Sequence, residues 1–204
     1  MSIFARLTVR QQQQKVREEA ILDATRVMLA RKGYDLMTVD EVAAEAGIAK
    51  ASLYKHFSSK ESLAAAVMIE LLDRALAFMD TLPAEMPPME QMQALLRWAL
   101  DLRLEGGLPL LPSTSSTLQA SLLANREYVK RILALNERMT GLVKAAQARG
   151  VIEPDLPPDV AVFALYARTC DPAVDYLQMT GRYTNKQVAD YLVRVAFGGL
   201  RGER

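Results

Sequence analysis

Cysteine and histidine are nearly absent from this chain of 204 residues, which contains one of each, Cys170 and His56. A single cysteine excludes an intrachain disulfide and indicates a reducing compartment. The sequence shows no cluster of residues at metal-ligand spacing, no phosphate-binding glycine loop and no serine elbow. We therefore expect no metal site, no cofactor and no enzymatic activity.

Long apolar stretches and a strong net charge are also absent. No apolar run approaches the roughly 20 residues of a membrane helix, and residues 1–7 are too short an apolar start for a signal peptide. The 25 basic and 24 acidic residues nearly balance, which argues against indiscriminate binding of polyanions. Residues 1–60, however, hold ten basic and seven acidic residues. We expect a cytoplasmic protein whose N-terminal part meets phosphate groups.

The apolar residues, which make up half of the chain, recur at helical spacing almost throughout. The sequence therefore predicts an all-α fold of about nine helices. They are expected over residues 9–32, 38–46, 50–56, 59–80, 89–104, 116–149 with an interruption near Asn125, 158–179 with a kink at Pro172, and 185–197. Residues 1–60 are expected to form one domain, in which residues 1–8 are a flexible arm and Arg6 and Arg10 are candidates for a DNA minor groove. Residues 61–204 are expected to form the second domain.

Capping residues mark the ends of the N-terminal helices. Thr38 and Glu41 have the spacing of a capping box, in which each side chain satisfies a free main-chain donor, and Ser58 and Glu61 repeat that spacing. Gly47 follows the first of these helices, where a left-handed backbone is needed. The pattern predicts a helix, a tight turn, a short helix and then a long helix.

Residues 38–61 carry the strongest functional signal in the chain. From Ala46 to Lys60 there are three lysines and the only histidine, and no acidic residue. A unit of two helices joined by a tight turn can lay one helix across DNA and present the other to the major groove. These residues therefore predict a helix-turn-helix that binds DNA.

The same segment resembles the DNA-binding domain of the tetracycline-repressor type (TetR/AcrR) regulators. The matching residues are Thr38, Val42-Ala43, Ala46-Gly47, Ser52-Leu53-Tyr54, His56-Phe57 and Lys60-Glu61. The resemblance covers residues 10–62 by motif, and the remainder by helix order and length. Ala49 departs from the pattern, because the family often has a serine there that caps the recognition helix, and loss of such a cap costs about 0.5–2 kcal/mol.

The residues around the short helix suit DNA by size and charge. Ala51 and Ser52 are small enough for a close approach to base edges, and the lysines and Tyr54 can reach phosphate oxygens. The predicted DNA-contacting residues are Thr38, Lys50, Ala51, Ser52, Tyr54, Lys55, His56 and Lys60, and the resemblance implies all of them except Ala51. The alternatives are that Tyr54 packs between helices and that His56 is an ordinary surface residue.

A two-fold dimer is expected, because one recognition helix reads few base pairs and two must sit about one DNA turn apart. The last two helices are apolar over more than one stripe. The predicted interface consists of Phe163, Ala167, Val174, Val188, Tyr191, Leu192 and Val195. The resemblance also implies a four-helix dimer bundle here, and packing within one subunit is the alternative.

The resemblance further implies a ligand pocket among the middle helices. The candidate lining residues are Met92, Trp98, Leu102, Tyr128, Phe163, Tyr166 and Cys170. Five of the ten methionines lie between Met68 and Met92, and their flexible side chains would make an adaptable apolar wall. Plain core packing is the alternative for each lining residue, and Asp101, Arg103 and Asp171 are either polar anchors or surface residues.

These features predict a sequence-specific transcriptional regulator, a repressor that a small apolar ligand releases from a palindromic operator. The ligand would be an acyl chain or an aromatic compound. Its binding would favour a conformation of the body in which the helix over residues 59–80 has moved, and would so shift the population of molecules away from the DNA-binding state. An activator of the same fold and a ligand-binding module without DNA function remain alternatives. An enzyme that uses Cys170 beside Asp171 is disfavoured, because the only histidine lies in the DNA-binding motif.

Overall fold

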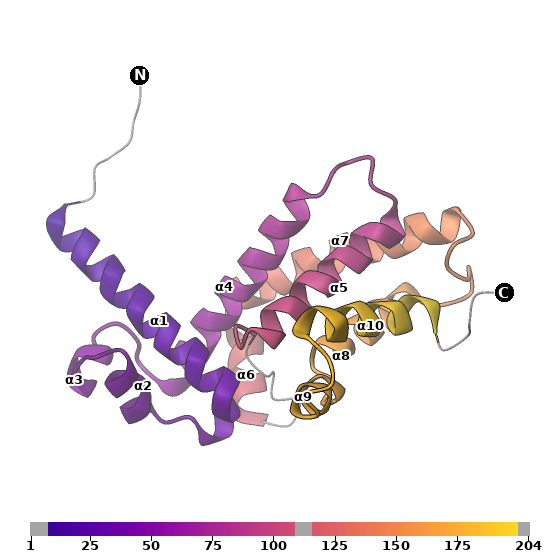
Figure 1. The fold of residues 1–204 in the computed structure, drawn as a ribbon. Coiled ribbons are helices and arrows are strands. Elements are labelled where there is room, and N and C mark those ends of the chain that lie inside the picture. Colours follow the sequence, from indigo (N-terminus) through magenta and orange to yellow (C-terminus); the bar gives the residue numbers. More distant parts are fainter. Residues whose placement is uncertain (1–7, 109–115, 200–204) are drawn as a thin grey trace.

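Helices make up the regular structure of the described part of the chain (Figure 1). The computed structural model describes residues 8–108 and 116–199. Its elements are α1 (Val9–Leu36), α2 (Val39–Glu45), α3 (Lys50–Leu53), α4 (Lys60–Thr81), α5 (Pro88–Leu104), α6 (Ser116–Ala124), α7 (Arg126–Ala148), α8 (Pro158–Thr169), α9 (Ala173–Met179) and α10 (Asn185–Gly198). The predicted all-α fold is confirmed. Arg10 lies in the first turn of α1, whereas Arg6 and the rest of residues 1–7, which belong to the predicted flexible arm, lie outside the described residues.

A compact N-terminal unit is built from α1, α2, α3 and the first half of α4. Ile21 of α1, Val42 of α2, Leu53 of α3 and Leu63 of α4 are buried in its core. The core forms because apolar residues three or four positions apart lie on one face of a helix. Because α4 and α6 both contribute side chains, the core extends beyond the predicted domain boundary at residue 60, which stays a prediction.

Two glycines turn the chain within this unit. Gly33 has φ 72° and ψ 172°, so the helical backbone of α1 breaks there and residues 34–36 form a separate turn. Gly47 has φ 66° and ends α2 as predicted, and the N–H of Ile48 donates to the carbonyl of Ala43 at 3.0 Å. Side chains with a Cβ atom rarely adopt these positive φ values, so glycine favours both turns.

The start of α4 differs from the prediction. The predicted capping box of Ser58 and Glu61 is wrong, because Ser59 is the capping residue and pairs with Ser62, each hydroxyl accepting the other residue's N–H at 3.0–3.1 Å. Glu61 instead accepts a 2.7 Å hydrogen bond from the hydroxyl of Tyr34. This contact ties the start of α4 to the end of α1.

The body consists of the second half of α4 together with the helices that follow. One cluster, which includes Met92 of α5, Met139 of α7 and Val162 of α8, fills the space between α4, α5, α7 and α8. A second cluster joins α5 to α9 and α10. Figure 1 shows α4 running from the N-terminal unit into the body. Within the described ranges, no helix has both the length and the apolar character needed to cross a membrane.

The single kinked helix predicted over residues 158–179 is two helices. α8 ends at Thr169, and Pro172 is the residue that caps α9. The side chain of Asp171 accepts the N–H of Ala173 at 2.9 Å, which starts α9 in a new direction. Proline has no N–H to continue the helical bonding, and here it separates two helices and does not merely bend one.

Candidate functional site

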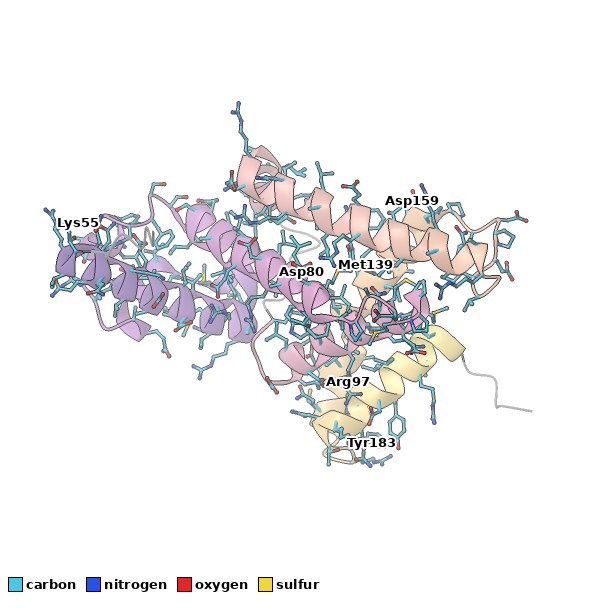
Figure 2. The ribbon with its side chains drawn as sticks, turned by 90° about the horizontal axis from the view of Figure 1, so that it is seen from above. Lys55, Asp80, Arg97, Met139, Asp159 and Tyr183 are labelled. Carbon is cyan, nitrogen blue, oxygen red and sulfur yellow. The ribbon has the colours of Figure 1, made fainter. Side chains whose placement is uncertain are left out.

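The short helix α3 lies at the outer end of the N-terminal unit. Figure 2 places Lys55, just after α3, at one end of the molecule, away from Tyr183 and Asp159 of the body. Leu53 is fully buried and anchors α3 to the core, while Ala51, Tyr54 and Lys55 are exposed. The exposure of Tyr54, 46 %, argues against the alternative that its ring packs between helices. The exposed side of α3 is therefore free to meet a large partner.

α3 is shorter than predicted, with helical bonding only over Lys50–Leu53. Ala49 occupies the capping position and makes no side-chain hydrogen bond, as expected from its departure from the family pattern. Residues 54–56 form a turn, in which the N–H of His56 donates to the carbonyl of Leu53 at 2.9 Å. Ser52 is half-buried, which leaves it on the edge of the exposed side.

Two of the predicted DNA-contacting residues, Lys50 and Thr38, are bonded to acidic residues of α2. The Lys50 ammonium lies 2.8 Å from the Asp40 carboxylate, and this hydrogen bond raises the pKa of Lys50. Both side chains are about half exposed or more, so a DNA phosphate would compete with the carboxylate. Thr38 forms the predicted capping box, which is confirmed: its hydroxyl accepts the N–H of Glu41 at 3.3 Å, and Glu41 accepts the N–H of Thr38 at 3.2 Å.

Lys60 and His56 tie the motif to α1. The Lys60 ammonium donates to the carbonyl of Asp35 at 3.2 Å and lies 4.3 Å from the centre of the Tyr34 ring. The His56 Nδ1 atom lies 3.2 Å from a carboxylate oxygen of Glu18, and this hydrogen bond holds the pKa of Glu18 below its usual value. Only 10 % of the His56 side chain is exposed. Both residues thus have contacts inside the protein, and their contact with DNA stays a prediction.

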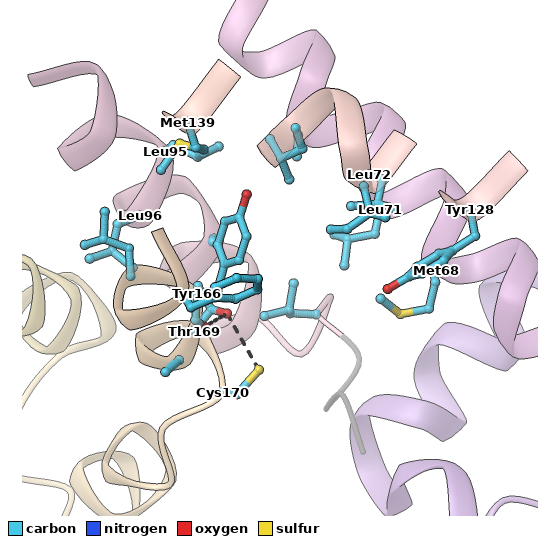
Figure 3. Close-up of a pocket in the computed structure, with 18 of the residues that line it drawn as sticks. Met68, Leu71, Leu72, Leu95, Leu96, Tyr128, Met139, Tyr166, Thr169 and Cys170 are labelled. Carbon is cyan, nitrogen blue, oxygen red and sulfur yellow. Dashed lines mark hydrogen bonds between the residues drawn. The ribbon is translucent and has the colours of Figure 1, made fainter. Parts of the chain in front are cut away.

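A cavity of about 730 Å³ lies between α4, α5, α6, α7 and α8 (Figure 3). Six of the seven predicted pocket residues line it: Met92, Trp98, Tyr128, Phe163, Tyr166 and Cys170. Sequence reasoning missed a group of apolar residues from α4, α6 and α7, which includes Met68, Leu71, Leu72, Leu118, Leu122, Leu135 and Met139. A cavity of this size and apolar character is suited to a small organic molecule.

Leu102 is the predicted pocket residue that does not line the cavity. It is buried, and its side chain lies against Gly107, where an added Cβ atom would meet the Leu102 Cδ1 atom at 2.7 Å. Leu102 therefore packs under the turn that follows α5. A sequence signal could have found more of the cavity. The apolar side of α4 is longer than the N-terminal core needs, which indicates that its remaining residues line something else.

The polar groups in the cavity are few and uncharged. They are the side chains of Gln119, Tyr128, Tyr166, Thr169 and Cys170, together with the indole N–H of Trp98. Thr169 donates its hydroxyl to the carbonyl of Tyr166 at 2.7 Å and lies 3.7 Å from the Cys170 sulfur. The Tyr166 hydroxyl is buried without a hydrogen-bond partner among the described residues, and burial raises the pKa of Tyr166. None of the described lining residues carries a charge.

One wall of the cavity also belongs to the core of the N-terminal unit. Met68, Leu118 and Leu122 line the cavity and are buried in that core. Tyr128, near the start of α7, lines the cavity and packs against both the N-terminal core and the core of the body. A molecule in the cavity would therefore contact side chains that support the helix-turn-helix.

The predicted dimer interface divides into exposed and buried residues. Phe163, Tyr191 and Val195 are exposed, by 61 %, 39 % and 40 %, as is Ala167, whereas Leu192 is half-buried. The placement of Val174 and Val188 at an exposed interface needs correction. Both are buried against α5 in the core of the subunit, because the α9 and α10 stripes that carry them face inward.

Arg103, offered as a ligand anchor or a surface residue, is neither. Its guanidinium donates to the carbonyl of Thr169 at 2.6 Å and to the carboxylate of Asp175 at 2.9 Å, and only 4 % of its side chain is exposed. It joins α5 to the break between α8 and α9. Asp101 instead pairs with Arg97 on the same helix at 2.9 Å.

A short exposed helix on a compact three-helix unit, joined to a helical body with an apolar cavity, defines a regulatory protein of the helix-turn-helix class. Residues 21–67 match the family model described as bacterial regulatory proteins, tetR family. The N-terminal unit is therefore a DNA-binding domain of the tetR-family type, and the chain is a DNA-binding transcriptional regulator.

Similar proteins agree over nearly the whole chain. The HTH-type transcriptional repressor KstR2 of Mycolicibacterium smegmatis is 24 % identical over 186 residues, which is 90 % of each protein. The regulator FadR of Bacillus subtilis, solved in complex with stearoyl-CoA, has a TM-score of 0.66 at 15 % identity and covers 90 % of this chain and 99 % of its own. AibR, solved with isovaleryl coenzyme A and operator DNA, has a TM-score of 0.62 at 23 % identity over 89 % and 98 % of the two chains. The two solved structures show that the fold is shared.

Proposed function

We propose that this regulator is a repressor that leaves its operator when an acyl thioester binds, with the acyl chain in the cavity. The observation that carries the proposal is the shared wall, in which Met68, Leu118 and Leu122 serve both the cavity and the N-terminal core. FadR and AibR support the ligand class, because each was solved with an acyl-CoA. KstR2, named as a repressor, supports the direction of the response.

The DNA contact is assigned to α3 and the residues beside it. Ala51 and Ser52 would face base edges in the major groove, and Lys50, Tyr54 and Lys55 would reach phosphates on either side. Thr38, His56 and Lys60 would lie at the rim, where their intramolecular bonds hold them in place. Because the chromosome of a bacterium lies in the cytoplasm, the protein would act there.

A homodimer would present two copies of α3 to a palindromic operator. The exposed Phe163, Ala167, Tyr191 and Val195 on α8 and α10 are suited to a self-complementary interface, since a monomer gains nothing by exposing them to water. Ligand binding would favour the body shape in which the two α3 helices no longer match the groove spacing. DNA and ligand then weaken each other's binding by the same factor.

The test starts with selection of genomic fragments by the purified protein at modest salt. The recovered duplex is then titrated by fluorescence anisotropy with and without short-, medium- and long-chain acyl-CoA esters. We expect tight binding that one chain length abolishes, and loss of binding in Tyr54→Ala with the dimer intact. Selection of no specific duplex by a folded dimer would favour a binding module without DNA function. In vitro transcription that rises with bound protein would indicate the activator.

A further inference from the structure

We propose that Tyr128 recognises an uncharged oxygen of the ligand, a carbonyl or a hydroxyl group, and that the cavity rejects a free carboxylate or amine of the same length. The inference deepens the proposed function and rests on it, because it assumes that the cavity is the ligand site. It identifies the polar part of the ligand and the side chain that binds it.

The position of Tyr128 carries the first step. Figure 3 shows its hydroxyl directed from α7 into the pocket beside Met68, at the opposite side of the pocket from Tyr166. Its main-chain N–H is bonded to the Asn125 side chain at 3.1 Å, which fixes the start of α7 and therefore the place of the ring. The hydroxyl itself has no hydrogen-bond partner among the described residues, and burial raises the pKa of Tyr128 with no contribution from a bonded neighbour. It is a donor without an acceptor in an apolar surrounding.

A donor of this kind selects a particular ligand group. A phenol donates one hydrogen bond and stays neutral at physiological pH, so it suits a carbonyl or hydroxyl oxygen. A carboxylate would need a cation, and an ammonium would need a carboxylate, because burying an unpaired charge costs far more than burying a neutral polar group. None of the described lining residues is charged, so neither kind of ion finds a partner there.

The other polar side chains are less suited to this role. Thr169 already donates its hydroxyl to the carbonyl of Tyr166. The Tyr166 hydroxyl is enclosed by packed side chains and is not exposed to the cavity space. Gln119 is exposed on α6, at the rim of the cavity. Among the hydroxyl groups that line the cavity, Tyr128 is thus the donor that a ligand oxygen meets.

Tyr128 also lies where recognition affects the DNA-binding unit. Its ring packs against the N-terminal core and against the core of the body. A ligand that forms a hydrogen bond with the Tyr128 hydroxyl would therefore contact a side chain that packs against both cores. An apolar molecule without an oxygen would fill the cavity but lack this contact.

The experiment uses the full-length dimer and the neutral fluorescent reporter N-phenyl-1-naphthylamine. The reporter is displaced by a ten-carbon series that consists of the methyl ketone, the carboxylate and the amine. We expect the ketone to bind at least about ten-fold more tightly than either ion, because only the ions lack a partner. Tyr128→Phe should weaken the ketone about five-fold, the value of one hydrogen bond, and leave reporter affinity unchanged. Tyr176→Phe, on the exposed Tyr176 outside the cavity, is the matched control and should bind like the unchanged protein.

The outcomes separate this inference from the proposed function. If neither the reporter nor the ketone binds, the cavity is not a ligand site and both proposals are wrong. If the ketone binds but the carboxylate competes equally, or Tyr128→Phe binds the ketone as before, the proposed function stands and the role of Tyr128 is wrong. Selective loss of ketone affinity in Tyr128→Phe alone supports the inference, since a change that only disturbed packing would also weaken the reporter.

Discussion

Tyr166→Phe should make the protein more stable, although it removes a polar group from the interior. The Tyr166 hydroxyl is buried and has no hydrogen-bond partner among the described residues. A buried donor without a partner lowers the free energy of unfolding by about 1–3 kcal/mol, because it has lost its hydrogen bonds to water and forms none in the protein. Phenylalanine keeps the ring, including its edge contact with Phe163 at 6.2 Å between centroids.

The size of the gain follows from two opposing effects. Removal of the unpaired hydroxyl recovers the desolvation cost, while the space left by one oxygen atom loses a few tenths of a kcal/mol, so the net gain is about 1 kcal/mol. For a chain of this length, that corresponds to a rise of about 2–4 °C in Tm. Urea unfolding followed by circular dichroism gives the free energy, and calorimetry gives the Tm.

Tyr176→Phe provides the comparison, because Tyr176 is 69 % exposed and its hydroxyl is not buried in the interior. That variant should change the free energy of unfolding by less than about 0.5 kcal/mol. A loss of stability in Tyr166→Phe would refute the reasoning, since it would mean that the hydroxyl has a partner in the native protein.

The other predictions concern the DNA surface, the break between α8 and α9, and the cap of α3. Lys55→Ala should weaken binding to all DNA sequences alike and reduce the number of counterions released on binding by about one. Fluorescence anisotropy over a salt series measures both quantities. Lys144→Ala, which replaces an exposed lysine of α7, is the control and should leave both unchanged. Arg103→Leu should lower the free energy of unfolding by about 1–3 kcal/mol, because the Thr169 carbonyl loses its donor, and an unaltered urea midpoint would contradict this. Ala49→Ser should raise stability by about 0.5–2 kcal/mol by supplying the missing cap of α3, and a Tm no higher than that of the original chain would show that serine does not cap there.

Local features of the fold were predictable from the sequence. The Thr38–Glu41 capping box and the turn at Gly47 depend on residues within a few positions of each other, and both were predicted correctly. The start of α4 was misplaced by one residue, because Ser58 and Ser59 are equally good caps. The hydrogen bond from Tyr34 to Glu61 distinguishes them in the structure, and it joins residues 27 positions apart.

Contacts between distant segments account for the remaining differences. His56 meets Glu18 across 38 positions and Lys60 meets Asp35 across 25, so a sequence pattern gives no sign of either contact. Periodicity identified the apolar stripes of the last helices but not which stripe faces inward, and Val188 was therefore placed on the outside. Most of the predicted pocket residues do line the cavity, because their helices follow the order that the family resemblance implied.

The leucines of α6 in the N-terminal core set a limit on protein engineering. A chimeric biosensor would join the DNA-binding unit of one regulator to the ligand-binding body of another. A cut at residue 60 would remove Leu63, Leu118 and Leu122 from the DNA-binding unit and replace them with side chains shaped for a different neighbour. A graft from this protein would have to carry α4 and the inward face of α6 with it, so the transferable module is not a continuous piece of sequence.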